Sequence, residues 1–184
     1  MADEKIHQAW EVIERRQLYR ADPWIDLSVE TVRLPGGGIV EDFHQLVLPD
    51  FALIFAQTEA GRVIVLRQYK HGPRRVGLSL PGGLVEKGEE PARAASRELL
   101  EETGYEADQW SHLGSYWVNA NLGCGKAHFF KARGARRVCE PCSGDLEEME
   151  ILLIEPADLA RGLTDGRVVL SNHVCGISLG LAAD

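Results

Sequence analysis

The segment from Gly82 to Tyr105 constrains the fold more than any other part of the sequence. It begins with two glycines and continues into a stretch in which apolar residues recur at helical spacing. Pro91 suits the first turn of a helix, and Gly104 is well placed to end it. We therefore expect a glycine turn that leads into one helix over residues 91–104.

The polar face of this helix carries three glutamates, Glu98, Glu101 and Glu102. Residues three and four apart share a helix face, so like charges placed there repel by roughly a few tenths of a kcal/mol per pair. Hard oxygen ligands grouped in this way suit Mg²⁺ or Mn²⁺, whose charge turns the repulsion into attraction. The alternative is a solvated acidic face, which the wider pattern of the segment disfavours.

The glutamates belong to a longer set of residues at fixed spacings. In order along the chain it is Gly83-x5-Glu89-x7-Arg97-Glu98-Leu99-x-Glu101-Glu102-x-Gly104-Tyr105, where x is any residue. This pattern closely resembles the signature box of the Nudix family. Only Tyr105 departs from it, because an aliphatic residue is usual there. The resemblance implies an α+β fold, an α/β/α sandwich in which helices flank a mixed β-sheet, with antiparallel strands at the N-terminus.

The rest of the sequence agrees with such a fold. Alternating or continuous apolar residues predict strands over 25–29, 43–48, 51–56, 63–66, 116–118, 127–132 and 151–154. The glycine triplet at 36–38 suits a hairpin turn, and residues 156–163 and 172–182 have the pattern of helices. We expect an N-terminal strand region over 1–45, a dimerisation element by the resemblance, and a Nudix hydrolase domain over 46–184.

The resemblance also assigns roles to individual residues. It makes Glu98 and Glu102 the principal metal ligands and Glu101 a ligand or a modulator, with the Gly82 carbonyl joining the metal shell. Arg97 is expected to orient a carboxylate rather than to touch substrate. The implied cofactor is Mg²⁺ or Mn²⁺, since cleaving a diphosphate requires charge neutralisation and an activated water.

Other candidate site residues lie outside the box. An acidic loop offers a general base by the resemblance, first Glu147 and then Glu148, with Asp145 beside them. The alternative is an ordinary exposed acidic turn. Arg67 or Lys70 supplies positive charge to the diphosphate, or else pairs with surface acids.

The resemblance outside the box is to the ADP-ribose pyrophosphatase-like branch, through Arg67-Gln68-Tyr69-Lys70 and Leu80-Pro81-Gly82-Gly83 in that branch's order. It implies a homodimeric enzyme that hydrolyses a nucleoside diphosphate derivative, ADP-ribose or a nucleotide sugar, to a nucleoside monophosphate and a phosphorylated moiety. Two departures keep GDP-mannose open, because residues 117–122 lack that subgroup's proline and Ser79 replaces a Glu. The aromatic residues that either stack on a base or pack in the core are Trp24, Tyr116 and Trp117.

Charge and hydropathy limit the partners. A net charge of −8 and a pI near 5.3 argue against nucleic acid, and so against RNA cap removal, and against anionic membranes. No apolar stretch approaches the length of a membrane span, and the N-terminus is polar rather than signal-like. We expect a cytoplasmic protein that binds a small-molecule nucleotide.

Two alternatives stay open. A non-catalytic Nudix-like sensor would bind ADP-ribose-type ligands without hydrolysis, but such domains typically carry a degraded box, whereas the box here is intact. Cys139 and Cys142, with His173 and Cys175, could hold zinc, although one Cys-x-x-Cys pair is a weak pattern.

Overall fold

The computed structural model describes residues 8–142, 144 and 148–183. The chain divides into two compact units. The first comprises residues 1–49 together with 117–125, and the second comprises residues 50–116 and 126–184. Each unit is described by itself below.

The N-terminal unit is built on a three-stranded antiparallel sheet in the order β1-β2-β3. Its strands are β1 (Glu11–Ala21), β2 (Ile25–Arg33) and β3 (Ile39–Val47). The predicted hairpin turn at 36–38 is confirmed, since the Gly37 amide donates to the Leu34 carbonyl at 2.8 Å. This sheet leaves large apolar side chains exposed, among them Val12, Ile13, Leu18, Tyr19, Trp24, Ile39 and Val47.

The segment 117–125 belongs to the N-terminal unit although it follows the box in sequence. Gln45 Nε2 donates to the Asn121 carbonyl at 2.9 Å, which joins this segment to β3. The unit therefore runs to Pro49 and includes a distant loop, whereas the sequence places a boundary between residues 45 and 46.

The second unit contains an eight-stranded mixed sheet in the order β11-β5-β4-β10-β8, with β6 beside β5, β7 beside β4 and β9 beside β10. Strands β4 and β10 pair in parallel, whereas the pairings of β4 with β5 and β7 are antiparallel. The strands are β4 (Phe51–Thr58), β5 (Val63–Lys70), β6 (Arg75–Ser79), β7 (Gly82–Leu84), β8 (Tyr105–Glu106), β9 (Gln109–Trp117), β10 (Lys126–Arg137) and β11 (Met149–Ile154).

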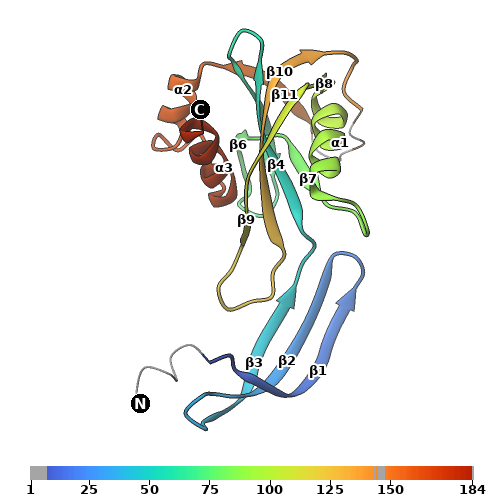
Figure 1. Ribbon diagram of the computed structural model, residues 1–184, viewed down its shortest axis with the longest axis vertical. Helices are drawn as coiled ribbons and strands as arrows, with labels where there is room; N and C mark the ends of the chain where they lie inside the picture. Colours follow the sequence, from blue (N-terminus) through green and yellow to red (C-terminus); the bar gives the residue numbers. More distant parts are fainter. Residues whose placement is uncertain (1–7, 143, 145–147, 184) are drawn as a thin grey trace. The chain divides into compact units, whose positions relative to one another are not determined.

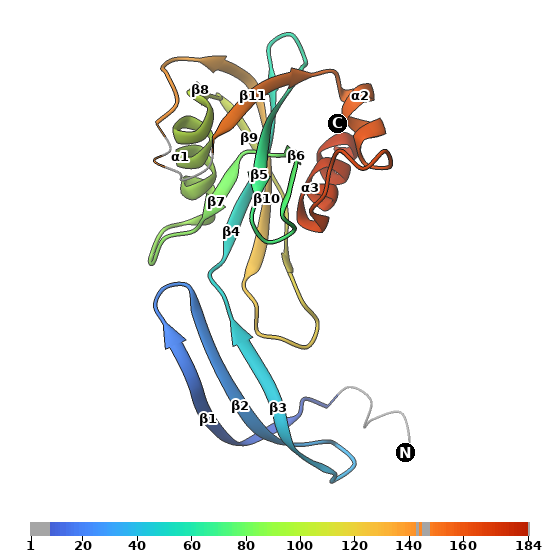
Figure 2. The ribbon, with the colours of Figure 1, turned by 180° about the vertical axis from the view of Figure 1, so that it is seen from behind.

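Helices cover both faces of this sheet, as Figures 1 and 2 show from opposite sides. Helix α1 (Pro91–Thr103) packs on one face, where Leu99 and its neighbours join the buried side chains of Ile54 and Phe130. Helices α2 (Pro156–Gly162) and α3 (Ser171–Ala182) pack on the other face, over a cluster that includes Phe55 and Val65. The predicted sandwich is thereby confirmed.

Helix α1 forms as its sequence predicts. Pro91 occupies its first turn, and Gly104 caps it with a φ of 73° while its amide donates to the Leu100 carbonyl at 2.8 Å. Ala94, Ala95 and Leu99 are buried against the sheet. Glu102 is buried on the same side of the helix, so its carboxylate also lies against the sheet.

The sequence did not resolve the short strands around this helix. It predicts a strand over 116–118, where the structure has the end of a longer strand, β9, and it assigns no strand to residues 82–84 or 105–106. Two- and three-residue strands carry too few side chains to show an alternation. None of the helices within residues 8–142, 144 and 148–183 is long and apolar enough to cross a membrane.

Candidate active site

The box residues meet where α1 lies against β7. Glu102 is buried, and its Oε2 accepts a hydrogen bond of 2.7 Å from the Gly82 amide. Gly82 has a φ of 152°, and a Cβ there would clash with the Ala52 carbonyl. A Cβ on Gly83 would clash with the carboxylate of Glu98. The two glycines therefore let two carboxylates lie directly against the strand backbone.

Arg97 holds three carboxylates through hydrogen bonds from every nitrogen of its guanidinium. Nη1 donates to Glu98 at 2.7 Å and to Glu101 at 3.0 Å. Nε and Nη2 bind the two oxygens of Glu89 at 3.1 and 3.0 Å, and Nη2 also donates to the Leu84 carbonyl. These bonds tie the helix to the loop before it.

The same contacts shift the protonation equilibria. The hydrogen bond from Arg97 lowers the pKa of Glu89, against the opposing effect of its partial burial. The pKa of Arg97 is raised above its ordinary value, chiefly by Glu89 and then by Glu98 and Glu101. Both groups are therefore charged at neutral pH.

The donor set fits a hard divalent cation. It offers the carboxylates of Glu98, Glu101 and Glu102, beside Gly82, whose amide contacts Glu102, and no thiolate or imidazole. Within residues 8–142, 144 and 148–183, no three acidic, His or Cys side chains are already gathered as a metal cluster. The positive charge of Arg97 offsets part of the charge of Glu98 and Glu101, with which it forms ion pairs of 2.7 and 3.0 Å.

The acidic loop is described only at its end. Asp145 and Glu147 lie outside the described residues, and Glu148 is an exposed residue directly before β11. The general base therefore stays a prediction.

Arg67 is not brought together with the box glutamates. It alternates along β5 with Val63 and Val65, which pack under α2 and α3, so its side chain emerges on the face opposite α1. There it forms an ion pair with Glu150 and lines a cavity of about 330 Å³ together with Arg167.

Lys70 ends β5, and its charge contributes to the lowered pKa of His173 on α3. Ser79, which replaces the Glu of the ADP-ribose subgroup, is buried and accepts a hydrogen bond of 2.8 Å from Gln68.

The candidate zinc residues serve other purposes. His173 is buried, and its Nδ1 accepts the Leu80 amide at 3.0 Å. Cys175 packs against the apolar cluster of Leu53 and Phe129. The two remaining cysteines of that set, Cys139 and Cys142, are exposed. The structure thus gives no support to a zinc site made of these four residues.

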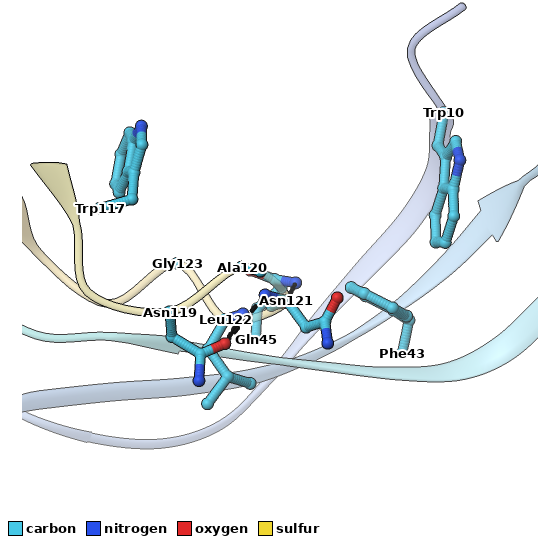
Figure 3. Close-up of a pocket in the computed structure, with 9 residues that line it drawn as sticks. All are labelled: Trp10, Phe43, Gln45, Trp117, Asn119, Ala120, Asn121, Leu122 and Gly123. Carbon is cyan, nitrogen blue, oxygen red and sulfur yellow. Dashed lines mark hydrogen bonds between the residues drawn. The ribbon is translucent and has the colours of Figure 1, made fainter. Parts of the chain in front are cut away.

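An aromatic pocket of about 480 Å³ lies within the N-terminal unit, shown in Figure 3. Trp10 and Phe43 meet edge to face with ring centroids 5.4 Å apart, and Trp117 lines the same pocket. The loop of residues 119–123, which lines the pocket, is held by the Asn119 side chain, which accepts hydrogen bonds from the amides of Asn121 and Leu122 at 2.8 and 3.0 Å.

Of the three aromatics named from the sequence, only Trp117 lines this pocket. Trp24 is exposed, and the Tyr116 ring packs near Phe129 at a centroid distance of 6.0 Å. Sequence reasoning missed Trp10 and Phe43, which lie 33 positions apart. Trp10 directly precedes β1 and Phe43 lies on β3, so only the folded sheet shows that the two rings meet. An aromatic residue among polar neighbours was the available signal in each case.

Comparison with known proteins identifies the class. The NUDIX domain model matches residues 48–165, and the chain therefore belongs to the Nudix family. A second model, the nucleoside diphosphate sugar hydrolase N-terminal domain, matches residues 10–46. The chain lies within the ADP-ribose pyrophosphatase-like branch, whose members, like Nudix hydrolases in general, use divalent cations.

Individual relatives agree with this assignment. The chain is 36% identical to CMP-5'-(N-acetyl-N-hydroxy-3-aminopropyl)phosphonate hydrolase of Streptomyces rubellomurinus, over 84% of this chain and 74% of that protein. It is 35% identical to ADP-ribose pyrophosphatase of Bacillus subtilis, over 59% of this chain and 58% of that protein. A crystal structure of an ADP compounds hydrolase has the same fold, with a TM-score of 0.73, 17% identity, and coverage of 94% of this chain and 92% of the other. The predicted enzyme class, a Nudix pyrophosphatase, is confirmed.

Proposed function

We propose that this enzyme hydrolyses ADP-ribose or a nucleotide sugar, in the presence of Mg²⁺ or Mn²⁺, to a nucleoside monophosphate and a phosphorylated moiety. The observation that carries the proposal is the contact of α1 with β7, where Gly82 and Gly83 make room for Glu102 and Glu98. The names of the relatives support the substrate class, because one is a hydrolase of a CMP derivative and another of ADP-ribose.

In this proposal Glu98 and Glu102 are the principal metal ligands, Glu101 is a ligand or a modulator, and the Gly82 carbonyl completes the protein's share. When bound, the divalent ion neutralises charge on the diphosphate oxygens and activates a water molecule. Arg97 orients Glu98 and Glu101 by its two Nη1 hydrogen bonds and is too fully engaged to hold substrate as well.

The proposed base is Glu147, with Glu148 as the second candidate, because a carboxylate near the metal can accept the proton of the attacking water. Lys70 is favoured over Arg67 as a contact of the diphosphate, since Arg67 lies on the face opposite α1 and pairs with Glu150.

The N-terminal unit supports one further part of the proposal. Its sheet exposes many large apolar side chains, and contiguous apolar surface of that kind marks a protein interface. We accordingly propose a homodimer that buries this sheet.

The test is phosphate release, after a coupled phosphatase, from ADP-ribose, GDP-mannose and other nucleotide derivatives with Mg²⁺ or Mn²⁺. The variant is Glu102→Gln, because the new amide oxygen still accepts the Gly82 amide while the ligand charge is lost. We expect turnover of one substrate class and a loss greater than about 100-fold in the variant, more than supporting residues of metal sites usually contribute.

A matched control is Glu59→Gln, which neutralises an exposed glutamate in the turn after β4 and should keep full activity. Binding of ADP-ribose without turnover under any metal condition would contradict the proposal and favour a sensor. Equal activity of wild type and Glu102→Gln would contradict the assigned metal ligand.

A further inference from the structure

A chain of hydrogen bonds joins four polar side chains beside the candidate metal site. Asp50 Oδ2 lies 3.2 Å from Nε2 of His128, and Nδ1 of His128 lies 2.7 Å from Oγ of Ser115. The same Ser115 oxygen lies 2.9 Å from Nε2 of His112. None of these residues belongs to the box or to the roles assigned above.

The direction of each hydrogen bond in the chain follows from Asp50, because an ionised carboxylate can only accept hydrogen bonds. The Asp50 carboxylate accepts a hydrogen bond from the Nε2–H of His128, so Nδ1 of that ring carries the lone pair and accepts a hydrogen bond from the Ser115 hydroxyl. The serine oxygen in turn accepts the Nε2 proton of His112. Asp50 is itself fixed, because its Oδ1 accepts the amide of Lys126 at 2.8 Å.

The inner and outer ends of this chain differ in exposure. His128 is only 8% exposed, whereas Ser115 and His112 are exposed to solvent. With the protons placed as above, Ser115 keeps one free lone pair and Nδ1 of His112 keeps another, and no partner for that nitrogen is found among the described residues. The exposed end therefore presents hydrogen-bond acceptors.

A glycine aims Ser115 at His128. Leu113 packs in the cluster of Phe129, and the Tyr116 ring also meets Phe129, although an odd number of positions separates the two residues. The regular alternation of side chains between the two faces of β9 is therefore interrupted between them, at Gly114. Gly114 has a φ of 140°, and a Cβ there would lie 2.6 Å from the Tyr116 ring. Such irregularities re-aim side chains next to active sites.

The register of the sheet places the chain beside the box. His128 of β10 pairs with Ala52 of β4, which in turn pairs with Gly83 of β7, the residue against which the Glu98 carboxylate lies. Two strand spacings separate His128 from Gly83, which is roughly 10 Å. Residues in register share a face, and Ser115 and His112 lie one strand further out, on β9, which pairs with β10.

We propose that Ser115 and His112, positioned by His128 and Asp50, form a subsite for the hydroxyl groups of the sugar attached to the outer phosphate. The inference rests on the proposed function, since it places that phosphate at the glutamates of α1. Free acceptors bind hydroxyl donors, and the nearby Asp50 carboxylate disfavours a phosphate, which only accepts. The subsite thus selects a polyhydroxyl moiety rather than a second anionic group.

The experiment compares two substrates of the wild type and of Ser115→Ala and His112→Ala. ADP-ribose carries the sugar hydroxyls, and the methyl ester of ADP carries the same diphosphate without them. We expect each variant to raise the KM for ADP-ribose about 3- to 10-fold, as for loss of one neutral hydrogen bond, with no change for the methyl ester. Ser115→Thr keeps the hydroxyl and should restore the KM, and Ser111→Ala on the same strand is the control.

Equal losses for both substrates would show a merely structural role and overturn the inference, as would unchanged kinetics. A binding measurement separates this outcome from failure of the proposed hydrolysis. By calorimetry with Mg²⁺ present, ribose 5-phosphate should bind wild type and lose affinity by the same factor in Ser115→Ala, whether or not turnover occurs. If Ser115→Ala weakened the binding of adenosine monophosphate but not of ribose 5-phosphate, the subsite would hold the nucleoside's ribose and the proposal would be overturned. Absence of ribose 5-phosphate binding to the wild type would also overturn it.

Discussion

His173 should make the protein sensitive to mild acid. Its imidazole is buried on α3, and its Nδ1 accepts the Leu80 amide just before the glycine turn of the box. Burial, with a smaller effect from the charge of Lys70, lowers the pKa of His173 from 6.5 to about 4. The folded protein therefore keeps this ring neutral at pH values at which the unfolded chain protonates it.

The sign and the size of the effect follow from these two pKa values. Because the folded pKa is the lower one, the contribution of His173 to stability is complete above pH 6.5 and is lost as the pH falls from 6.5 towards 4. Between pH 7.5 and pH 5 the free energy of unfolding should fall by about 2 kcal/mol through this one group.

The assay is urea unfolding, followed by circular dichroism, of the wild type and of His173→Asn at both pH values. The Asn carboxamide oxygen can still accept the Leu80 amide but does not titrate. We expect the variant to lose about 2 kcal/mol less than the wild type on acidification. His44→Asn, which removes an exposed imidazole from β3, controls for the loss of a ring.

An identical loss of stability in wild type and His173→Asn would refute this reasoning. So would a nuclear magnetic resonance titration in which the His173 ring of the folded protein is positively charged, with both nitrogens protonated, at pH 5. Either result would mean that water or a rearranged neighbour solvates the ring.

Two glycine substitutions test the packing around the site. In Gly180→Ala the new methyl group would lie 2.6 Å from Cβ of Phe55. The resulting strain should outweigh the gain in helix propensity and lower the free energy of unfolding by about 2 kcal/mol. The control is Gly36→Ala, whose methyl group meets nothing within 4 Å and should leave the free energy of unfolding unchanged. Unfolding curves of the two variants that coincide would contradict this. Gly83→Ala should displace the carboxylate of Glu98, which can move at little cost in stability. Activity at limiting metal concentration should fall about 10- to 100-fold, as measured by a metal titration. An unchanged metal requirement would count against Glu98 as a ligand.

The helix of the box was predictable because several local signals agree on it. Pro91, Gly104 and the buried Leu99 each specify the same helix, and a pattern of that kind does not depend on distant parts of the chain. The glycines before it were also predictable as a turn. That Gly83 faces the Glu98 carboxylate required the structure, since it depends on how α1 lies on β7.

Long-range placement was beyond the sequence. Arg67 and Lys70 are three positions apart on one strand, and choosing the face of Arg67 requires knowing that Val63 and Val65 pack under α2 and α3. The same holds for the pair of His128 and Asp50, which lie 78 positions apart and meet through the parallel pairing of β4 with β10. Parallel pairing leaves no turn signal between its strands.

The guanidinium of Arg97 has a consequence for how the enzyme meets its cofactor. Because it already offsets part of the charge of Glu89, Glu98 and Glu101, the folded chain has its own internal counter-ion before any metal arrives. Metal uptake at this helix then adds a cation to carboxylates whose mutual repulsion Arg97 has already reduced. The protein can fold first and acquire its metal afterwards, so the metal supply sets activity without also setting the amount of folded enzyme.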